Sequence, residues 1–312
     1  MENAGQGAKS AAASRKVGGL PFRVETCADA PLERPSWMKI RVRSGQKAEV
    51  SEILKQERLR TVCEEATCPN LSECFAKRTA TFLILGRTCT RRCPYCDISH
   101  GRPLPPDPAE PARLAEAAER MGLRFIVITS VDRDDLKDGG AGHFAACVRE
   151  LRARIPGCQV EILVPDFRGR LETALEKLKA DPPDVFNHNI ETVPSLFRTA
   201  RPGGSYEKSL ELLRRFGEAC PGVPTKSGIM AGLGEKDEEL FAVMRDLRAA
   251  GVTLLTIGQY LPPSRHHIAV RRYVTPDEFE AYREKALSLG FRDCMSGPFV
   301  RSSYRAASLS AG

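Results

Sequence analysis

Apolar segments with the length of β-strands alternate with helical segments along most of this chain. The strand-like segments are Thr81–Leu85, Arg124–Ser130, Gln159–Pro165, Asp184–Ile190, Thr225–Ala231 and Thr253–Tyr260. The helical patterns between them are Pro111–Met121, His143–Arg154, Leu171–Ala180, Tyr206–Ala219 and Glu238–Ala250. Strict alternation places a helical crossover between strands that run in the same direction, as in a parallel α/β sheet. We therefore predict an α/β fold, a partial (β/α)6 barrel of the TIM type.

Six of the 11 cysteines form two compact triplets. The first has the spacing C-x₄-C-x₅-C and the second has the spacing C-x₃-C-x₂-C. Their members are Cys63, Cys68 and Cys74, followed by Cys89, Cys93 and Cys96. Each triplet supplies three thiolates, one fewer than the four that usually hold an iron–sulfur cluster. Because such a cluster leaves one iron open to another ligand, the pattern predicts two clusters that take part in chemistry.

Two other uses of cysteine compete with this interpretation. A disulfide framework is disfavoured, because the number of cysteines is odd and we recognise no secretory signal. Zinc is the stronger alternative, because Cys93 and Cys96 form a CxxC pair. A zinc site usually has four ligands, however, and neither triplet has a fourth Cys or His at a normal zinc spacing. The five remaining cysteines are scattered: Cys27, Cys147, Cys158, Cys220 and Cys294.

The second triplet directly follows the first strand-like segment, on a loop at the carboxyl end of that strand. In TIM-type barrels these loops carry the chemistry. The first triplet precedes the barrel, so we expect an N-terminal cluster-binding extension folded over the barrel mouth, with a C-terminal segment closing the mouth. The expected division is an N-terminal extension over residues 1–47 with a disordered start, an auxiliary cluster-binding segment over 48–78, the barrel over 79–290 and the C-terminal segment over 291–312.

Composition limits the classes of partner. The net charge is +7 at pH 7, but the basic residues are spread out and form no RNA-binding signature, so we expect no nucleic acid. An acidic protein substrate fits this charge equally well. No apolar run reaches the length of a membrane span, so we expect no membrane partner. The first twenty residues predict a disordered tail, or alternatively an organellar transit peptide, and reduced thiols favour the cytoplasm or an organelle matrix.

The second triplet has a recognisable context. Cys89-Thr-Arg-Arg-Cys93-Pro-Tyr-Cys96 resembles the signature of the radical S-adenosylmethionine superfamily. The resemblance implies that these three cysteines hold a 4Fe–4S cluster, whose open iron binds the amino and carboxyl groups of S-adenosylmethionine. It also implies that Tyr95, before the last cysteine, lies beside the adenine.

Motifs elsewhere resemble those of the lipoyl synthase family. Cys63-Glu-Glu-Ala-Thr-Cys68-Pro-Asn-Leu-Ser-Glu-Cys74 is similar to the family's auxiliary-cluster motif. One serine of the closing motif is the fourth ligand of that cluster in the family; the match favours Ser303, although sequence alone does not separate it from Ser302. The other similar segments are Thr129–Leu136, Asn187–Thr192, Gly258–Leu261 and Arg301–Tyr304.

The resemblance implies a sulfurtransferase that inserts two sulfur atoms, at carbons 6 and 8 of a protein-bound octanoyl-lysine. It implies S-adenosylmethionine and two 4Fe–4S clusters as cofactors, the auxiliary cluster being consumed as the sulfur source. The implied partners are octanoylated lipoyl domains of 2-oxoacid dehydrogenase complexes or the glycine cleavage H protein. A flavodoxin- or ferredoxin-type reductant and an iron–sulfur carrier for cluster repair are implied as well.

The implied contacts to S-adenosylmethionine follow the second and fourth strand-like segments. They are Ser130, Asp132, Asn187, Asn189 and Glu191. For Asp132 or Asn187, capping of the following turn is the alternative role. For the whole chain, the alternatives are another radical sulfur-inserting enzyme and a non-enzymatic two-cluster electron carrier. Such carriers generally complete four cysteines per cluster, which disfavours the second alternative.

Overall fold

The computed structural model describes residues 17–38, 47–66, 68, 70, 71, 74, 81–304 and 306. Seven strands form one sheet in which sequence order is also spatial order, and all six pairings are parallel. The strands are β1 (Thr81–Ile84), β4 (Phe125–Ser130), β5 (Gln159–Leu163), β6 (Val185–Asn187), β7 (Thr225–Ala231), β8 (Leu254–Gln259) and β9 (Asp293–Gly297). Within the described residues β1 and β9 do not pair, so the barrel is open and the predicted partial barrel is confirmed.

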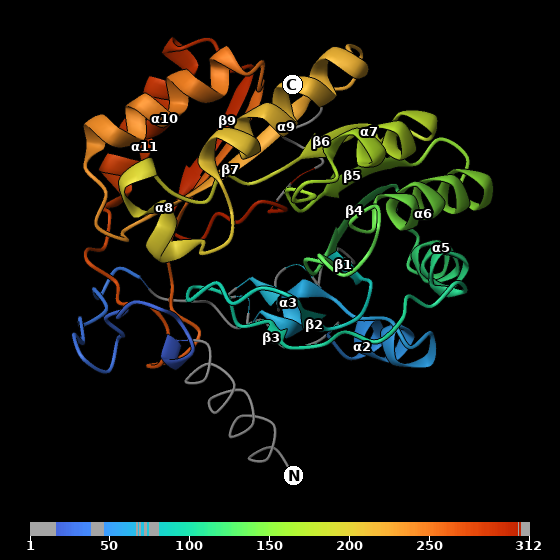
Figure 1. Cartoon of the computed structure of the whole chain (residues 1–312), viewed down its shortest axis with the longest axis horizontal. Coiled ribbons are helices and arrows are strands. Elements are labelled where there is room, and N and C mark those ends of the chain that lie inside the picture. The colour runs from blue at the N-terminus through green and yellow to red at the C-terminus, as the bar shows by residue number, and fades with distance from the viewer. Residues whose placement is uncertain are drawn as a thin grey trace.

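Helices connect every pair of neighbouring strands and lie on the outer side of the curved sheet (Figure 1). They are α5 (Glu110–Arg120), α6 (Ala141–Arg154), α7 (Leu171–Ala180), α8 (Pro194–Ala200), α9 (Tyr206–Ala219), α10 (Asp237–Ala249) and α11 (Pro276–Ser288). Two further helices, α2 (Lys47–Gln56) and α3 (Val62–Glu65), precede the sheet. No helix in the described part of the chain combines the length and apolarity needed to cross a bilayer.

The sequence pattern predicts six of the strands and five of these helices, but it does not predict α8, α11 or β9. Strand β9 reads Asp-Cys-Met-Ser-Gly and lacks the β-branched and aromatic residues that mark a strand. Only its parallel pairing with β8, from Leu254 opposite Asp293 to Gly258 opposite Gly297, makes it a strand. Strand β9 is part of the sheet and lies beyond residue 290, the expected end of the barrel.

Buried side chains on both faces hold the layers together. Phe186 of β6 stacks on Phe216 of α9 with ring centroids 3.7 Å apart, and Ile128 of β4 and Ile162 of β5 are fully buried. Because parallel strands are covered on both faces, continuous apolar runs are the expected sequence for β4 and β8. This core fixes the carboxyl ends of the strands, which carry the site.

A buried ion pair lies inside the barrel. Lys226 of β7 and Glu161 of β5 have side chains that are 0% and 1% exposed, and Lys226 Nζ lies 2.9 and 3.0 Å from the two carboxylate oxygens. Asn187 of β6 donates from Nδ2 to Glu161 Oε1 at 2.9 Å. A buried ion pair offsets its desolvation cost only when such additional hydrogen bonds are made. The three polar groups therefore stabilise one another and link three adjacent strands.

We predict that Lys226→Met will lower the free energy of unfolding of the apoprotein by about 3–5 kcal/mol, because it leaves the Glu161 carboxylate buried without its cation. The double variant Lys226→Met/Glu161→Leu should recover most of that loss, because both charges are then removed. Urea unfolding followed by circular dichroism measures both. A double variant less stable than Lys226→Met would contradict the proposed coupling.

Candidate active site

A cavity of about 550 Å³ opens at the carboxyl ends of the strands. Its size falls within the range of small-molecule and cofactor sites. Every barrel strand from β4 to β8 contributes to its wall, directly or through the residues that follow it. The cavity therefore lies where a barrel of this kind carries its chemistry.

The second cysteine triplet lies on a loop that follows β1. Two short strands, β2 (Thr88–Cys89) and β3 (Ser99–His100), pair at the base of this loop, and all three of its cysteines line the cavity. Burial, then Asp132 and the neighbouring thiol of Cys96, raise the pKa of Cys93 to about 12. A buried thiol group of this kind becomes a thiolate only beside a cation, and a coordinated metal provides one.

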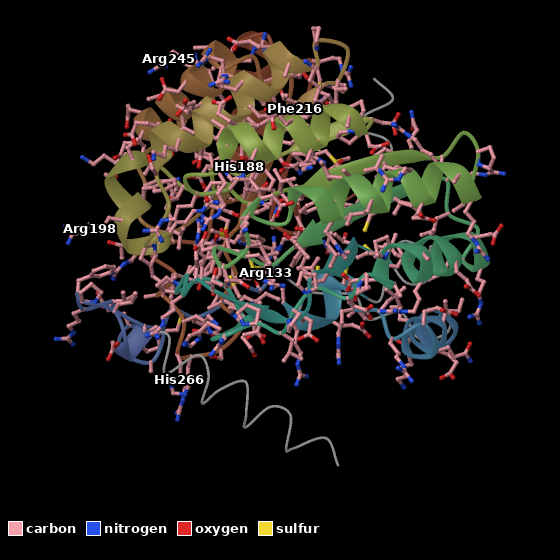
Figure 2. All side chains as sticks on the ribbon, turned by 45° about the vertical axis from the view of Figure 1, so that its right-hand side comes forward. Arg133, His188, Arg198, Phe216, Arg245 and His266 are labelled. Atoms are coloured by element: carbon pink, nitrogen blue, oxygen red, sulfur yellow. The ribbon has the colours of Figure 1, made fainter. Side chains whose placement is uncertain are left out.

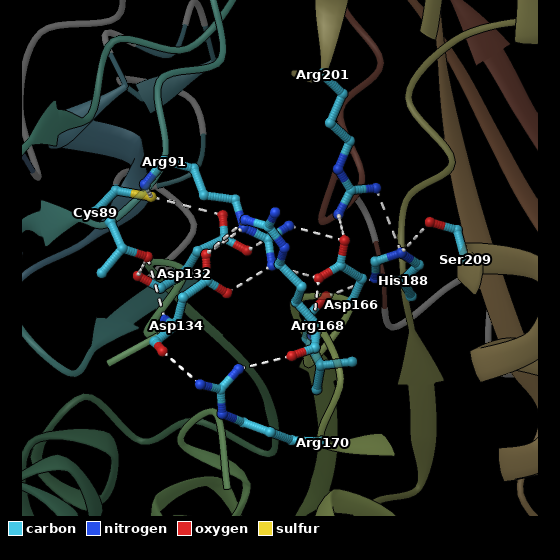
Figure 3. A network of polar contacts seen from close by, with 12 residues as sticks. Cys89, Arg91, Asp132, Asp134, Asp166, Arg168, Arg170, His188, Arg201 and Ser209 are labelled. Atoms are coloured by element: carbon cyan, nitrogen blue, oxygen red, sulfur yellow. Dashed lines mark hydrogen bonds and ion pairs between the residues drawn. The ribbon is translucent and has the colours of Figure 1, made fainter. Parts of the chain in front are cut away.

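Arg91 anchors the cysteine loop (Figure 3). Its side chain is 4% exposed and lies within ion-pair distance of three carboxylates: Asp132 at 3.4 Å, Asp134 at 2.8 Å and Asp166 at 2.5 Å. Burial alone would raise the pKa of Asp166, but hydrogen bonds and charge from Arg91 outweigh it and hold that pKa well below its usual range. The loop is thereby attached to the ends of β4 and β5.

A second buried arginine, Arg201, extends this network toward β6 (Figure 3). Arg201 Nη1 donates to the Asn189 carbonyl at 2.9 Å, and Nη2 lies 3.9 Å from Asp166. Burial and the charge of Arg201 lower the pKa of His188 to about 3, so this imidazole is neutral at physiological pH. His188 Nδ1 lies 2.8 Å from the Val164 carbonyl, which requires the proton on Nδ1. Figure 2 shows His188 among the interior side chains.

Several buried polar atoms in the cavity wall have no hydrogen-bond partner in the described structure. They are Ser130 Oγ, Asp132 Oδ1, Asn189 Oδ1 and Tyr260 OH. Buried polar atoms are nearly always hydrogen-bonded, so atoms of this kind around one cavity indicate a polar ligand. Ser130, Asp132 and Asn189 are also among the predicted contacts to S-adenosylmethionine, whose amino, carboxyl and ribose groups offer both donors and acceptors. The polar atoms of the cavity wall therefore fit that cofactor.

The first triplet lies at the same cavity. Cys63 in α3 is buried, and burial together with the neighbouring thiols of Cys68 and Cys74 raises its pKa to about 12. Cys63 and Cys68 line the cavity, whereas Cys74 is not among the lining residues. In the described residues no three potential ligands converge as they would around a single metal ion. An iron–sulfur cluster binds each thiolate at a separate iron, so its ligands need not converge on one point. The three thiols of each triplet therefore fit a cluster better than a single metal ion.

The C-terminal segment after β9 covers the cavity and places both candidate serines in its wall. Thr81 Oγ1 donates to Ser303 Oγ at 2.8 Å, whereas Asn189 Nδ2 donates to Ser302 Oγ at 2.7 Å. The close approach requires glycine in β8: a Cβ at Gly258 would lie 2.1 Å from the Val300 carbonyl oxygen. Segments from both ends of the chain thus meet over the barrel mouth.

Most of the predicted site residues line this one cavity. Besides five of the six motif cysteines, they are Tyr95, Ser130, Asp132, Asn189, Glu191, Ser302 and Ser303. Asn187 does not line it, because its side chain points to Glu161 inside the barrel. The sequence patterns assign no role to Arg91, Asp166 or Arg201. The position of Arg91 between two motif cysteines was a sequence signal for a role in the site. Its acidic partners could not be identified in this way, because they lie on loops that are distant in the sequence.

Comparison with known proteins identifies the family. A model described as the radical SAM superfamily matches residues 83–247. The chain is 61% identical to the lipoyl synthase of Actinobacillus succinogenes, covering 88% of this chain and 87% of that protein. It is 59% identical to the lipoyl synthase of Methylococcus capsulatus, covering 94% and 91%.

Two solved structures show the same fold at low identity. Methylornithine synthase matches with a TM-score of 0.51 and 15% identity over 90% of this chain and 76% of that chain. A maturase of the [FeFe]-hydrogenase matches with a TM-score of 0.52 and 15% identity over 93% and 68%. Together with the close sequence relatives and the cavity lined by both cysteine triplets, these findings establish that the chain belongs to the lipoyl synthase family of radical SAM proteins.

Proposed function

We propose that this protein catalyses the lipoyl synthase reaction, as a sulfurtransferase (EC 2.8.1.8) that inserts two sulfur atoms into a protein-bound octanoyl chain. The observation that carries the proposal is the shared cavity: thiols of both triplets and the two C-terminal serines line it together. An electron carrier would have no use for a cavity of about 550 Å³ between its cluster sites. A substrate that must meet both sites requires such a space.

Each triplet has its own role in this proposal. Cys89, Cys93 and Cys96 hold the cluster beside S-adenosylmethionine, and Cys63, Cys68 and Cys74 hold the auxiliary cluster. When bound, these cofactors supply the radical that breaks unactivated C–H bonds and the sulfur that replaces the hydrogen, while the protein binds and orients them. We assign the described part of residues 48–78 to the auxiliary layer, residues 81–290 to the barrel and the described part of residues 291–312 to the segment that closes the mouth.

We assign the fourth auxiliary ligand to Ser303. Its hydroxyl accepts a hydrogen bond from Thr81, and Thr81 also hydrogen-bonds the Cys63 thiol, so Ser303 lies on the side of the first triplet. Ser302 is instead held by Asn189, beside the predicted S-adenosylmethionine contacts. An alkoxide is a harder ligand than a thiolate, so softness preferences make it the more easily released partner of a sulfur-rich cluster.

The polar wall residues bind S-adenosylmethionine in this proposal. Ser130 and Asn189 supply buried polar atoms that lack a hydrogen-bond partner, Asp132 adds a carboxylate whose Oδ1 is paired only with Arg91, and Glu191 lies beside them with Tyr95. Burial raises the pKa of Glu191, and the nearby charge of Arg201 counters that effect. Asn187 acts indirectly, through its hydrogen bond to Glu161 and hence to Lys226.

Lipoyl domains are the substrate class. Within that class, the proposed substrates are octanoylated lipoyl domains of 2-oxoacid dehydrogenase complexes or the glycine cleavage H protein. Sustained turnover needs a flavodoxin- or ferredoxin-type reductant and an iron–sulfur carrier, because the auxiliary cluster is consumed. We place the reaction in the cytoplasm.

We predict that each triplet holds half of the iron. The reconstituted protein should carry about eight irons, and replacing either triplet with alanine should leave about four. Only replacement of Cys89, Cys93 and Cys96 should abolish S-adenosylmethionine cleavage, because the first triplet is not needed to generate the radical. Iron analysis and chromatographic detection of 5′-deoxyadenosine measure this. Equal loss of cleavage in both variants would disprove the division of roles.

We predict that binding of a whole octanoylated lipoyl domain will weaken with salt. The chain carries a charge of +7, and an acidic domain would be attracted over a distance that falls to roughly 3 Å at 1 M salt. A short neutral octanoyl-lysyl peptide should respond little, since it lacks the charged surface. Fluorescence anisotropy at increasing ionic strength compares the two. The same salt dependence for both ligands would show that the basic surface has no part in docking.

We predict that Ser303→Cys will retain the auxiliary cluster but impair sulfur transfer, because thiolate is the softer ligand and holds its iron more firmly. Ser303→Ala should lose auxiliary iron on dilution and lose product as well. Both variants should still form 5′-deoxyadenosine. Mass spectrometry of an octanoyl-lysyl peptide and iron analysis provide the readouts, with Ser302→Ala as the matched control. If Ser303→Ala made lipoyl product normally, the ligand would have to be another residue.

A further inference from the structure

Three segments of the chain border the cavity and are joined to one another by backbone hydrogen bonds. Ile268 N–H donates to the Pro94 carbonyl at 3.2 Å, and Ala28 N–H donates to the Arg265 carbonyl at 2.8 Å. Each segment contributes residues to the cavity wall. Figure 1 shows the blue N-terminal segment, β2 and β3 along its lower edge, away from α9 and α10. We call the three segments together the rim; they are residues 24–38, 86–106 and 261–271.

The rim carries exposed arginines that form no ion pair with any residue the structure describes. They are Arg34, Arg87, Arg92, Arg102 and Arg265. Many surface arginines of the outer helices, by contrast, have a carboxylate partner, as Arg149 has in Asp181 at 2.8 Å and Arg154 has in Glu119 at 2.7 Å. The positive charge of the rim is therefore available to a binding partner.

Carboxylates on the rim offset only part of this charge. Glu25 forms an ion pair with Arg271 at 2.6 Å, and the side chain of Asp97 is only 6% exposed. The exposed carboxylates left are those of Asp29 and Glu33, which are fewer than the exposed unpaired arginines. The rim thus presents an excess of positive charge to solvent.

Large apolar side chains are exposed on the same segments. Within the described residues, those exposed to solvent are Leu32, Trp37 and Leu104, at 46%, 41% and 83%. Each of them lies within three positions of Arg34 or Arg102. Aromatic side chains and arginine are enriched where proteins bind one another, and tryptophan and arginine often dominate the binding energy. Apolar and basic side chains side by side on the rim therefore favour a protein as its partner.

The proposed substrate requires a docking surface of this kind. In the proposed function the octanoyl chain is attached to a lysine of a folded domain. The cavity of about 550 Å³ has the size of a small-molecule site, so it admits the chain but not the domain. The body of the domain must therefore rest on the surface that borders the cavity while its octanoyl chain is inside.

We propose that the rim docks an acidic face of the octanoylated domain. The inference rests on the proposed function, because it requires that substrate. The unpaired arginines attract the domain and orient it, since complementary charge mainly raises the association rate and fixes the register of a complex. Trp37 and Leu104 add affinity by losing apolar surface to the partner. Arg102 and Arg265 lie on different segments of the rim, so changing both tests the surface and not a single loop.

The test reverses the charge at these two positions. Arg102→Glu/Arg265→Glu should lower kcat/KM for a whole octanoylated lipoyl domain about tenfold at low salt, through KM, because electrostatic attraction is lost. Turnover of a short neutral octanoyl-lysyl peptide should not change. The matched control is Arg245→Glu/Lys208→Glu, which makes the same change of charge at exposed positions of α10 and α9. Figure 2 shows Arg245 on the opposite side of the molecule from His266, which follows Arg265.

Two further measurements separate docking from a loss of structure. A domain whose acidic face has been changed to lysine should react faster with Arg102→Glu/Arg265→Glu than with the wild type, because the two charges are then exchanged. Arg102→Gln/Arg265→Gln removes the charges without adding new ones, so it should show a smaller loss with the unmodified domain and a weaker dependence on salt than the wild type.

The outcomes decide between the two levels of the proposal. Equal losses in the rim and control variants, or no loss in the rim variant, would overturn this inference alone. If the rim variant also lost peptide turnover, the glutamine variant would decide, and its full activity with the whole domain would overturn the inference. A wild-type protein that forms no lipoyl product from the peptide would overturn the proposed function and this inference with it.

Discussion

The ion pairing of Arg91 with three carboxylates is the interaction on which the site depends. The cysteine loop follows a four-residue strand and has little regular structure of its own beyond the two-residue pairing of β2 with β3. Arg91 attaches it to the loops after β4 and β5 through Asp132, Asp134 and Asp166. Hydrogen bonds from the backbone N–H and the hydroxyl of Thr90 to the Asp132 carbonyl add to this attachment, and Asp132 lies 3.5 Å from the Cys89 sulfur. Such a buried network is stable only when nearly all of its members are paired, which also makes it rigid.

The parts that sequence predicts are those with a local signal. Alternating apolar and amphipathic segments predict six strands, and the bounds of α7 and α9 agree with the structure. Helix α11 was predictable too, because Thr275 and Glu278 form a capping box at its start. Strand β9 was not, since its residues have no strand propensity and its pairing with β8 decides its structure. The contact of Arg91 with Asp166 could not be predicted either, because these residues lie 75 positions apart in the sequence.

Motif matching predicts which residues take part in the site, but not which way each one points. Asn187 and Asn189 are two positions apart in one motif, yet Asn187 points to Glu161 inside the barrel and Asn189 reaches the cavity. Ser302 and Ser303 are adjacent and equally polar, and their different partners distinguish them only in three dimensions. Alternation along an extended chain would place residues two positions apart on the same side, but β6 ends at Asn187, so the alternation does not extend to Asn189.

The two cysteine triplets lie in electrostatically different surroundings, although they share one cavity. Near the second triplet, the carboxylates of Asp132, Asp134 and Asp166 are held in a largely buried network with the guanidiniums of Arg91, Arg168 and Arg201. Near the first, Glu64 and Glu65 follow Cys63 in α3, and Glu65 pairs with the exposed Arg60. Adding an electron is disfavoured by neighbouring anions and favoured by a neighbouring cation, and buried charges are screened only weakly. The buried network around Cys89, Cys93 and Cys96 would therefore act on a cluster there more strongly than the partly exposed charges beside Cys63 would act on a cluster at the first triplet.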